Sequence, residues 1–140
     1  MAKVSLSTTL PVPARTVWDT IGGFNSLARG HPAVAKSEET KEGAATIRRL
    51  SLHGGGCIVE RLEAKDDRKR TYTYSIVSGP LPVAGYEARL QVEENKDGKS
   101  CTVDWSSRFE PSGASEPDAV KVIRGIYEAG FENLRKMFGT

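Results

Sequence analysis

The sequence is poor in the residue types that mark several protein classes. It has two cysteines and two histidines in 140 residues. Cys57 and Cys101 are too few for a disulfide framework and suit a reducing compartment. His31 and His53 have no cysteine or carboxylate at a metal-binding spacing, so we expect no metal and no cofactor. A phosphate-binding loop is also absent, because Gly54, Gly55 and Gly56 connect two predicted strands with no helix after them.

Long apolar runs and concentrated charge are missing as well. No stretch approaches the roughly 20 apolar residues of a membrane helix. The N-terminus alternates polar and apolar residues from Lys3 onward, unlike a signal peptide, so we expect a cytoplasmic protein without a membrane span. The 20 basic and 18 acidic residues leave a net charge of +2. Because these charges are spread along the chain, we expect no nucleic acid as a partner.

What the sequence contains is the pattern of one α+β domain over residues 1–140, long enough to bury a core. Apolar residues alternate with polar ones up to Leu10, and a helix is predicted from about Pro13 to Ile21. The segment Asn25–His31 can add one further helical turn. Six strands are predicted between Ala33 and Glu110. A helix of about 23 residues follows, capped by Ser115 and stopped by Gly139.

One hairpin fixes the face of two strands. The pair Asp97-Gly98 suits a two-residue turn with positive φ at both positions. The opposite pairs would then be Val92–Val103, Leu90–Trp105, Ala88–Ser107 and Tyr86–Phe109. This register places every apolar residue of both strands on one face, which is the sign of a correct register.

A second hairpin turns at the three consecutive glycines. Centring the turn on Gly54 sets Arg48 opposite Glu60, and the second strand continues inward through Leu62 and Ala64. Glycines permit several turn types, so this register is less constrained than the first.

The predicted inner face holds more polar side chains than a core built only for packing. Arg48 and Glu60 either form an ion pair that satisfies itself or border a ligand cavity. The tyrosines can be core or rim residues, and His31 can be a rim residue without chemistry. Glycines in the long helix either lower its stability without a structural role, or they let a ligand or the sheet approach the helix closely. The candidate ligand-binding residues are Arg48, Glu60, Tyr72, Tyr74, Tyr86, Trp105, His31, Ile126 and Gly130.

With these residues in place, the chain resembles the polyketide cyclase/dehydrase-type branch of the START/pollen-allergen-like (SRPBCC) superfamily. The matching stretches cover nearly the whole chain. They are residues 17–19, 21–24, 31–34, 48–52, 60–62, 72–76, 80–83 with Tyr86, 103–105 and 125–127. The resemblance implies a helix-grip fold, in which a seven-stranded curved antiparallel sheet wraps around the long C-terminal helix. It also implies one or two short helices after the first strand and a hydrophobic tunnel. Two positions depart from the family pattern: Gly30 replaces the usual tryptophan and Gly85 the usual asparagine.

Three functions fit these observations. The first is binding of a hydrophobic or aromatic small molecule in a cavity between sheet and helix, by a monomer or homodimer. The second is a cyclase or dehydratase, in which Glu60 and Arg48 would be catalytic and Tyr86 or His31 would be further acid–base candidates. The third is a protein-interaction module, which predicts a large exposed apolar patch and no cavity.

Overall fold

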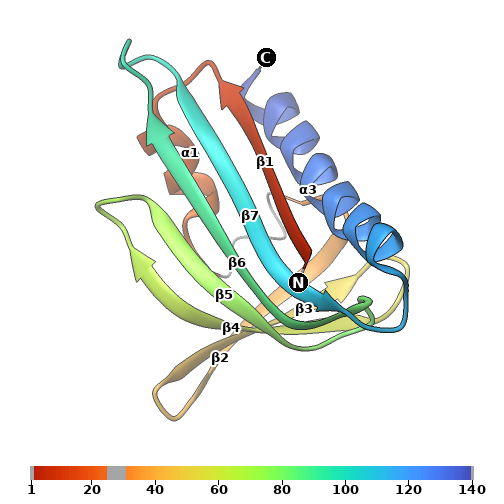
Figure 1. The fold of residues 1–140 in the computed structure, drawn as a ribbon. Helices are drawn as coiled ribbons and strands as arrows, with labels where there is room; N and C mark the ends of the chain where they lie inside the picture. Colours follow the sequence, from red (N-terminus) through yellow and green to blue (C-terminus); the bar gives the residue numbers. More distant parts are fainter. Residues whose placement is uncertain (1, 25–30, 140) are drawn as a thin grey trace.

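The computed structural model describes residues 2–24 and 31–139, which form one curved antiparallel sheet with two helices against its inner face (Figure 1). The elements are β1 (Ala2–Leu10), α1 (Ala14–Ile21), β2 (Val34–Glu42), β3 (Ala45–Leu52), β4 (Cys57–Asp66), β5 (Thr71–Ser78), β6 (Val83–Glu94), β7 (Cys101–Pro111) and α3 (Glu116–Phe138). The six strands predicted after the first helix are confirmed.

The strand order β1-β7-β6-β5-β4-β3-β2 makes the sheet a meander that its first strand joins at the far edge. Strand twist accumulates over seven strands and bends such a sheet. In Figure 1, β1 and β7 run beside α3, whereas β3 and β2 sweep round beneath it. The helix therefore lies in the hollow of the sheet, which confirms the predicted helix-grip arrangement.

The register of the β6–β7 hairpin is confirmed, but its turn differs from the prediction. Val92 pairs with Val103 as expected. However, the loop is closed by the Asn95 amide, which donates to the Ser100 carbonyl at 3.0 Å, and only Gly98 has a positive φ, of 66°. The loop is longer than two residues because the Asp97 carboxylate accepts the amides of residues 99 and 100.

The same ladder skips Tyr86, so the predicted pairing of Tyr86 with Phe109 is wrong. A bulge shifts the register between Ala84 and Glu87, and Gly85 has a φ of 61° there. A bulge reorients the backbone without moving the hairpin register beyond it. Both rings still point inward, with centroids 6.0 Å apart.

The β3–β4 hairpin follows the predicted register. Arg48 pairs with Glu60, and the Leu52 amide donates to the Gly56 carbonyl at 3.1 Å. The prediction for Ala64 is wrong: it is exposed, because the β4–β5 ladder has an irregularity between Leu62 and Ala64 that breaks the alternation of side chains.

The helices begin and end close to the predicted positions. Pro13 is the N-cap residue of α1 rather than its first helical residue. In α3 the Ser115 hydroxyl accepts the amide of Asp118 at 3.3 Å, as predicted, and Gly139 forms the C-cap. The buried stripe of α3 consists of Ala119, Ile123, Tyr127, Gly130, Phe131 and Leu134.

Two expectations fall on residues outside those described. They are the further helical turn, most of which spans 25–30, and the effect of Gly30 in place of a tryptophan. Within residues 2–24 and 31–139, neither helix combines the length and apolar character that a membrane crossing needs.

The Ser115 cap gives a first prediction. Replacing Ser115 by alanine removes the acceptor for an otherwise unpaired helix amide and should lower the free energy of unfolding by about 1 kcal/mol. Urea denaturation measures the change. Ser112→Ala, three residues before the cap, is the matched control, and equal losses in the two variants would contradict the capping role.

Candidate functional site

A cavity of about 250 Å³ lies between the inner face of the sheet and α3. Sixteen residues line it: His31, Ala33, Val34, Leu50, Leu52, Ile58, Glu60, Tyr74, Ile76, Leu81, Tyr86, Trp105, Val122, Ile123, Ile126 and Tyr127. Six of the nine sequence-predicted site residues are among them. Arg48, Tyr72 and Gly130 are not: Arg48 pairs with Glu60 of the wall, and Tyr72 and Gly130 line a separate hollow of about 30 Å³ on the other side of Trp105.

The one carboxylate in this wall belongs to an ion pair. Arg48 Nε donates to Glu60 Oε1 at 2.7 Å, and Arg48 Nη2 lies 2.7 Å from the same oxygen. The side chains are 1% and 6% exposed, so water reaches almost none of the pair. As the register predicted from the sequence requires, Arg48 on β3 and Glu60 on β4 are paired across the two strands. Their side chains are therefore close enough to form the ion pair.

The remaining nitrogens of Arg48 tie distant segments together. Nη1 donates to the carbonyl of Phe24 at 2.8 Å and to the hydroxyl of Tyr72 at 3.4 Å. The guanidinium carbon lies 4.2 Å from the ring centroid of Phe24 and 4.8 Å from that of Tyr74. A cation between two aromatic faces is stabilised by both rings. Within the described residues, Nη2 makes no hydrogen bond of good geometry, despite its closeness to Glu60.

Burial and pairing act in opposite directions on these two charges. Burial lowers the pKa of the Arg48 guanidinium, but the Glu60 carboxylate together with the hydroxyls of Tyr72 and Tyr74 outweighs burial, so the pKa lies above its ordinary value. Burial raises the pKa of Glu60 above its ordinary value, although Arg48 opposes the shift. A guanidinium does not lose its proton in a protein. Because both Nε and Nη2 of Arg48 lie 2.7 Å from Glu60 Oε1, the Glu60 side chain is held as the carboxylate anion.

Aromatic side chains from β5, β6, β7 and α3 form another part of the wall. The Trp105 indole N–H donates to the Tyr74 hydroxyl at 3.0 Å, and the hydroxyls of Tyr86 and Tyr127 are bonded to each other. The Trp105 and Tyr127 rings stack with centroids 4.1 Å apart. Burial raises the pKa of Tyr74, Tyr86 and Tyr127, so all three hydroxyls stay protonated.

His31 is buried rather than on an exposed rim, with 4% exposure. Its Nδ1 accepts the amide of Ala33 at 3.1 Å, so Nε2 carries the proton and donates to the Ile126 carbonyl at 2.7 Å. Burial lowers the pKa of this imidazole, although the bond to Ile126 opposes the shift. His31 thus attaches the segment before β2 to the middle of α3, with its ring edge-on to Trp105.

Gly130 makes this close approach possible. A Cβ at this position would lie 3.0 Å from the Trp105 ring and 3.1 Å from the His31 ring. Gly125, one and a half turns earlier, has open space at the same point. Of the two readings of the helix glycines, close approach therefore applies to Gly130, and what approaches is the sheet and the His31 segment.

Ten of the sixteen lining residues were not predicted as site residues; nine of them have aliphatic side chains, and the tenth is Tyr127. Tyr127 was assigned only to the apolar stripe of α3, yet it lines the cavity and bonds to Tyr86. The signal was its hydroxyl, since a buried tyrosine needs a partner. Phe24, which contacts Arg48 through its ring and its carbonyl, had no local signal because it lies beyond the predicted helix.

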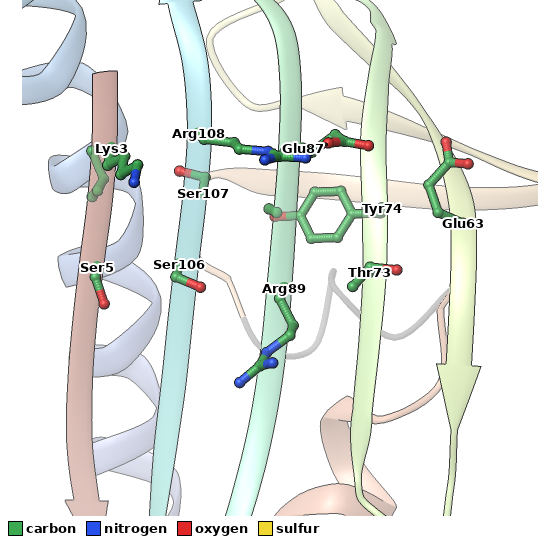
Figure 2. A pocket seen from close by; sticks show the side chains of 12 residues that line it. Lys3, Ser5, Glu63, Thr73, Tyr74, Glu87, Arg89, Ser106, Ser107 and Arg108 are labelled. Atoms are coloured by element: carbon green, nitrogen blue, oxygen red, sulfur yellow. Dashed lines mark hydrogen bonds and ion pairs between the residues drawn. The ribbon is translucent and has the colours of Figure 1, made fainter. Parts of the chain in front are cut away.

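A larger hollow of about 480 Å³ crosses the outer face of the sheet (Figure 2). Serine and threonine side chains leave room there between charged neighbours. Figure 2 shows Arg108 and Glu87 reaching toward each other, and their ion pair measures 2.9 Å. Both partners are more than half exposed, so the contact is weak. The residues that line this hollow are mostly charged, serine or threonine, whereas the cavity beneath α3 is lined mostly by aliphatic and aromatic side chains.

Among residues 2–24 and 31–139, no three histidine, cysteine, aspartate or glutamate side chains lie close enough together to hold a metal ion.

The two helix glycines give a second prediction. Gly125→Ala should raise the free energy of unfolding by up to about 1 kcal/mol, because alanine favours a helix and has room there. Gly130→Ala should gain nothing or lose stability, since its Cβ presses on two packed rings. Urea denaturation of the pair tests this, and equal stabilisation would show that the rings yield freely.

The ion pair gives a third prediction. Arg48→Met leaves the Glu60 carboxylate buried without its partner and should cost about 3–5 kcal/mol near neutral pH. Without Arg48 the pKa of Glu60 rises further. Because a raised folded-state pKa gives stability that is present at low pH and lost as pH rises, the loss should shrink on acidification.

Two controls accompany this measurement. Arg61→Met breaks an exposed pair with Glu63 on β4 and should change stability by less than about 1 kcal/mol. The double variant Arg48→Met/Glu60→Gln should recover part of the loss. A pH-independent deficit that the double variant does not relieve would mean that Arg48 acts through packing alone.

Comparison with known proteins places this geometry in context. The chain is 37% identical to the protein XoxI from Bacillus cereus, with 99% of this chain and 96% of that chain covered and a TM-score of 0.93. An aromatase/cyclase from Streptomyces is 17% identical, with 97% and 95% covered and a TM-score of 0.73. A START superfamily protein from Mycobacterium smegmatis is 13% identical, with 97% and 96% covered and a TM-score of 0.79. These last two likenesses concern the fold.

No protein of curated function matches the chain. The family model described as polyketide cyclase/dehydrase and lipid transport matches residues 1–139, almost the whole sequence. With that match, the helix-grip sheet and the similarity to XoxI, this chain belongs to the polyketide cyclase/dehydrase and lipid transport family.

Proposed function

We propose that this chain binds a hydrophobic or aromatic small molecule in the cavity between the sheet and α3. The observation that carries the proposal is the composition of the cavity wall. Aliphatic side chains from β2, β3, β4 and α3 surround a small number of fixed polar groups, as in most small-molecule sites. The family, whose description names lipid transport as well as cyclases, supports the same conclusion.

The size of the cavity limits the ligand. A volume of about 250 Å³ lies just below the range of roughly 300–1,000 Å³ of drug-sized sites, which favours a compact molecule over a long lipid. Val122 on α3 lines the cavity and is 40% exposed, so this side chain lies where the cavity meets solvent. Entry of a ligand would then pass between α3 and the β2–β3 end of the sheet.

A cyclase or dehydratase is the second candidate, and Glu60 is the observation that favours it. It is a buried carboxylate in the wall of the cavity with a raised pKa, which is the property of a general acid or base. The similar fold of an aromatase/cyclase is consistent with this role. For that reaction Arg48 would act behind Glu60 as a positioning residue, because it does not line the cavity.

The protein-interaction module has less support. The large exposed apolar side chains of the described residues are Val77, Val122 and Met137, which belong to β5 and to opposite halves of α3. Scattered exposed side chains of this kind are normal on a protein surface.

Ligand binding is tested with native mass spectrometry and a panel of aromatic and lipid compounds. We expect one compound bound per chain, and at least tenfold weaker binding by Ile58→Trp, whose indole would fill the cavity. Val59→Trp, the neighbouring half-buried position whose side chain alternates to the outer face, is the matched control. A protein that is empty on purification and binds nothing in the panel would contradict the proposal.

Turnover separates the two candidates. If the chain is an enzyme, Glu60→Gln should abolish product formation while binding and fold survive. Retained turnover in that variant would exclude Glu60 as the acid or base.

A further inference from the structure

The carboxylate of Glu60 is used on one side only. Oε1 receives both close contacts from Arg48, through Nε and Nη2. Among the described residues no hydrogen bond reaches Oε2. Glu60 lines the cavity, whereas Arg48 does not, and of the two side chains Glu60 keeps the larger exposure, 6% against 1%. The oxygen that is still able to accept hydrogen bonds, Oε2, is therefore the one available to the cavity.

An acceptor of this kind is costly if it stays empty. A carboxylate oxygen can accept about two hydrogen bonds, and leaving it without any in an apolar enclosure carries a penalty. Its neighbours in the wall include Leu50, Ile58 and Ile76, which have no donor to offer. Tyr74 accepts the Trp105 N–H, the hydroxyls of Tyr86 and Tyr127 are bonded to each other, and among the described residues none of these three hydroxyls forms a hydrogen bond with Glu60. A partner for Oε2 thus has to come from the contents of the cavity.

We propose that Oε2 of Glu60 anchors a hydrogen-bond donor of the ligand, so that the cavity selects neutral molecules with a hydroxyl or N–H group and rejects carboxylates. This inference rests on the proposed binding function and names the class of ligand. A carboxylate in the cavity would meet the Glu60 anion directly, because Arg48 lies behind Glu60 and is almost fully buried. Like charges at short range in a poorly hydrated site repel strongly.

The aromatic side chains in the cavity wall indicate the shape of the molecule. The rings of Tyr86, Trp105 and Tyr127 all border the cavity, and the Trp105 and Tyr127 rings are stacked on each other with their centroids 4.1 Å apart. Flat aromatic groups pack well against such rings. Together with the volume of about 250 Å³, this favours one or two fused rings with a single donor group.

Four probes of nearly equal size test the inference. They are 2-naphthol, which has a donor, 2-methoxynaphthalene and 2-methylnaphthalene, which have none, and 2-naphthoate, which is anionic at neutral pH. Chemical-shift titration of the purified full chain gives the four affinities. We expect 2-naphthol to bind roughly tenfold more tightly than the methoxy and methyl compounds, the difference of about one hydrogen bond to a charged group, and 2-naphthoate to bind most weakly.

The outcomes separate this inference from the proposed function. If none of the four probes binds although another compound of the aromatic and lipid panel does, the inference fails and the proposed function stands; if the protein is also empty on purification and binds nothing in that panel, both fail. If the two uncharged probes without a donor bind as tightly as 2-naphthol, the cavity is a ligand site but Glu60 does not select a donor. Tightest binding of 2-naphthoate would overturn the inference in the same way and point to Arg48 as the anchor.

Variants assign the effect to Glu60. In Glu60→Gln the preference for 2-naphthol over 2-methoxynaphthalene should fall severalfold and the discrimination against 2-naphthoate should weaken. Glu63→Gln, on the outer face of the same strand, is the matched control and should leave all four affinities unchanged. The wild-type series decides the question by itself if Glu60→Gln does not fold.

Discussion

The buried pair of Arg48 and Glu60 is the interaction on which the rest of the site depends. Two opposite charges almost without water must satisfy each other, and their remaining hydrogen-bonding capacity needs partners as well. Arg48 finds them in the carbonyl of Phe24 and the hydroxyl of Tyr72, and its planar face lies against aromatic rings. One side chain therefore connects β3, β4, β5 and the segment after α1. The same pairing fixes where the Glu60 carboxylate stands in the cavity wall.

The other boundary of the cavity is set by how closely α3 approaches the sheet. At Gly130 the helix has no side chain, so the rings of Trp105 and His31 reach its surface. His31 then bonds to a carbonyl in the middle of the helix, and Trp105 stacks on Tyr127. Toward the β2–β3 end the sheet curves away, and larger side chains such as Ile126 line the gap that remains. The cavity is the space between a tight contact at Gly130 and a sheet whose curvature carries it away from the helix.

Much of the fold could be predicted because its signals are local. Alternation along the strands identified the inner face, and the glycine hairpin brought Arg48 opposite Glu60. The Ser115 cap marked the start of α3. The prediction failed where the backbone departs from alternation, at the bulge before Glu87 and at Ala64. A bulge adds one residue to one strand. Gly85 is a local signal for the first bulge, whereas the sequence around Ala64 has no feature that distinguishes it from regular strand.

The site divides along the same line. By itself the sequence determined that Arg48, Glu60, Tyr74 and Trp105 share one face of the sheet, because side-chain alternation and hairpin register are properties of neighbouring residues. Only the tertiary structure decided which inner side chains face the cavity and which support it. Arg48 lies behind the wall and Tyr127 lies in it, although both come from predicted inner faces. That choice depends on where α3 crosses the sheet and how closely it packs, which no single strand or helix specifies.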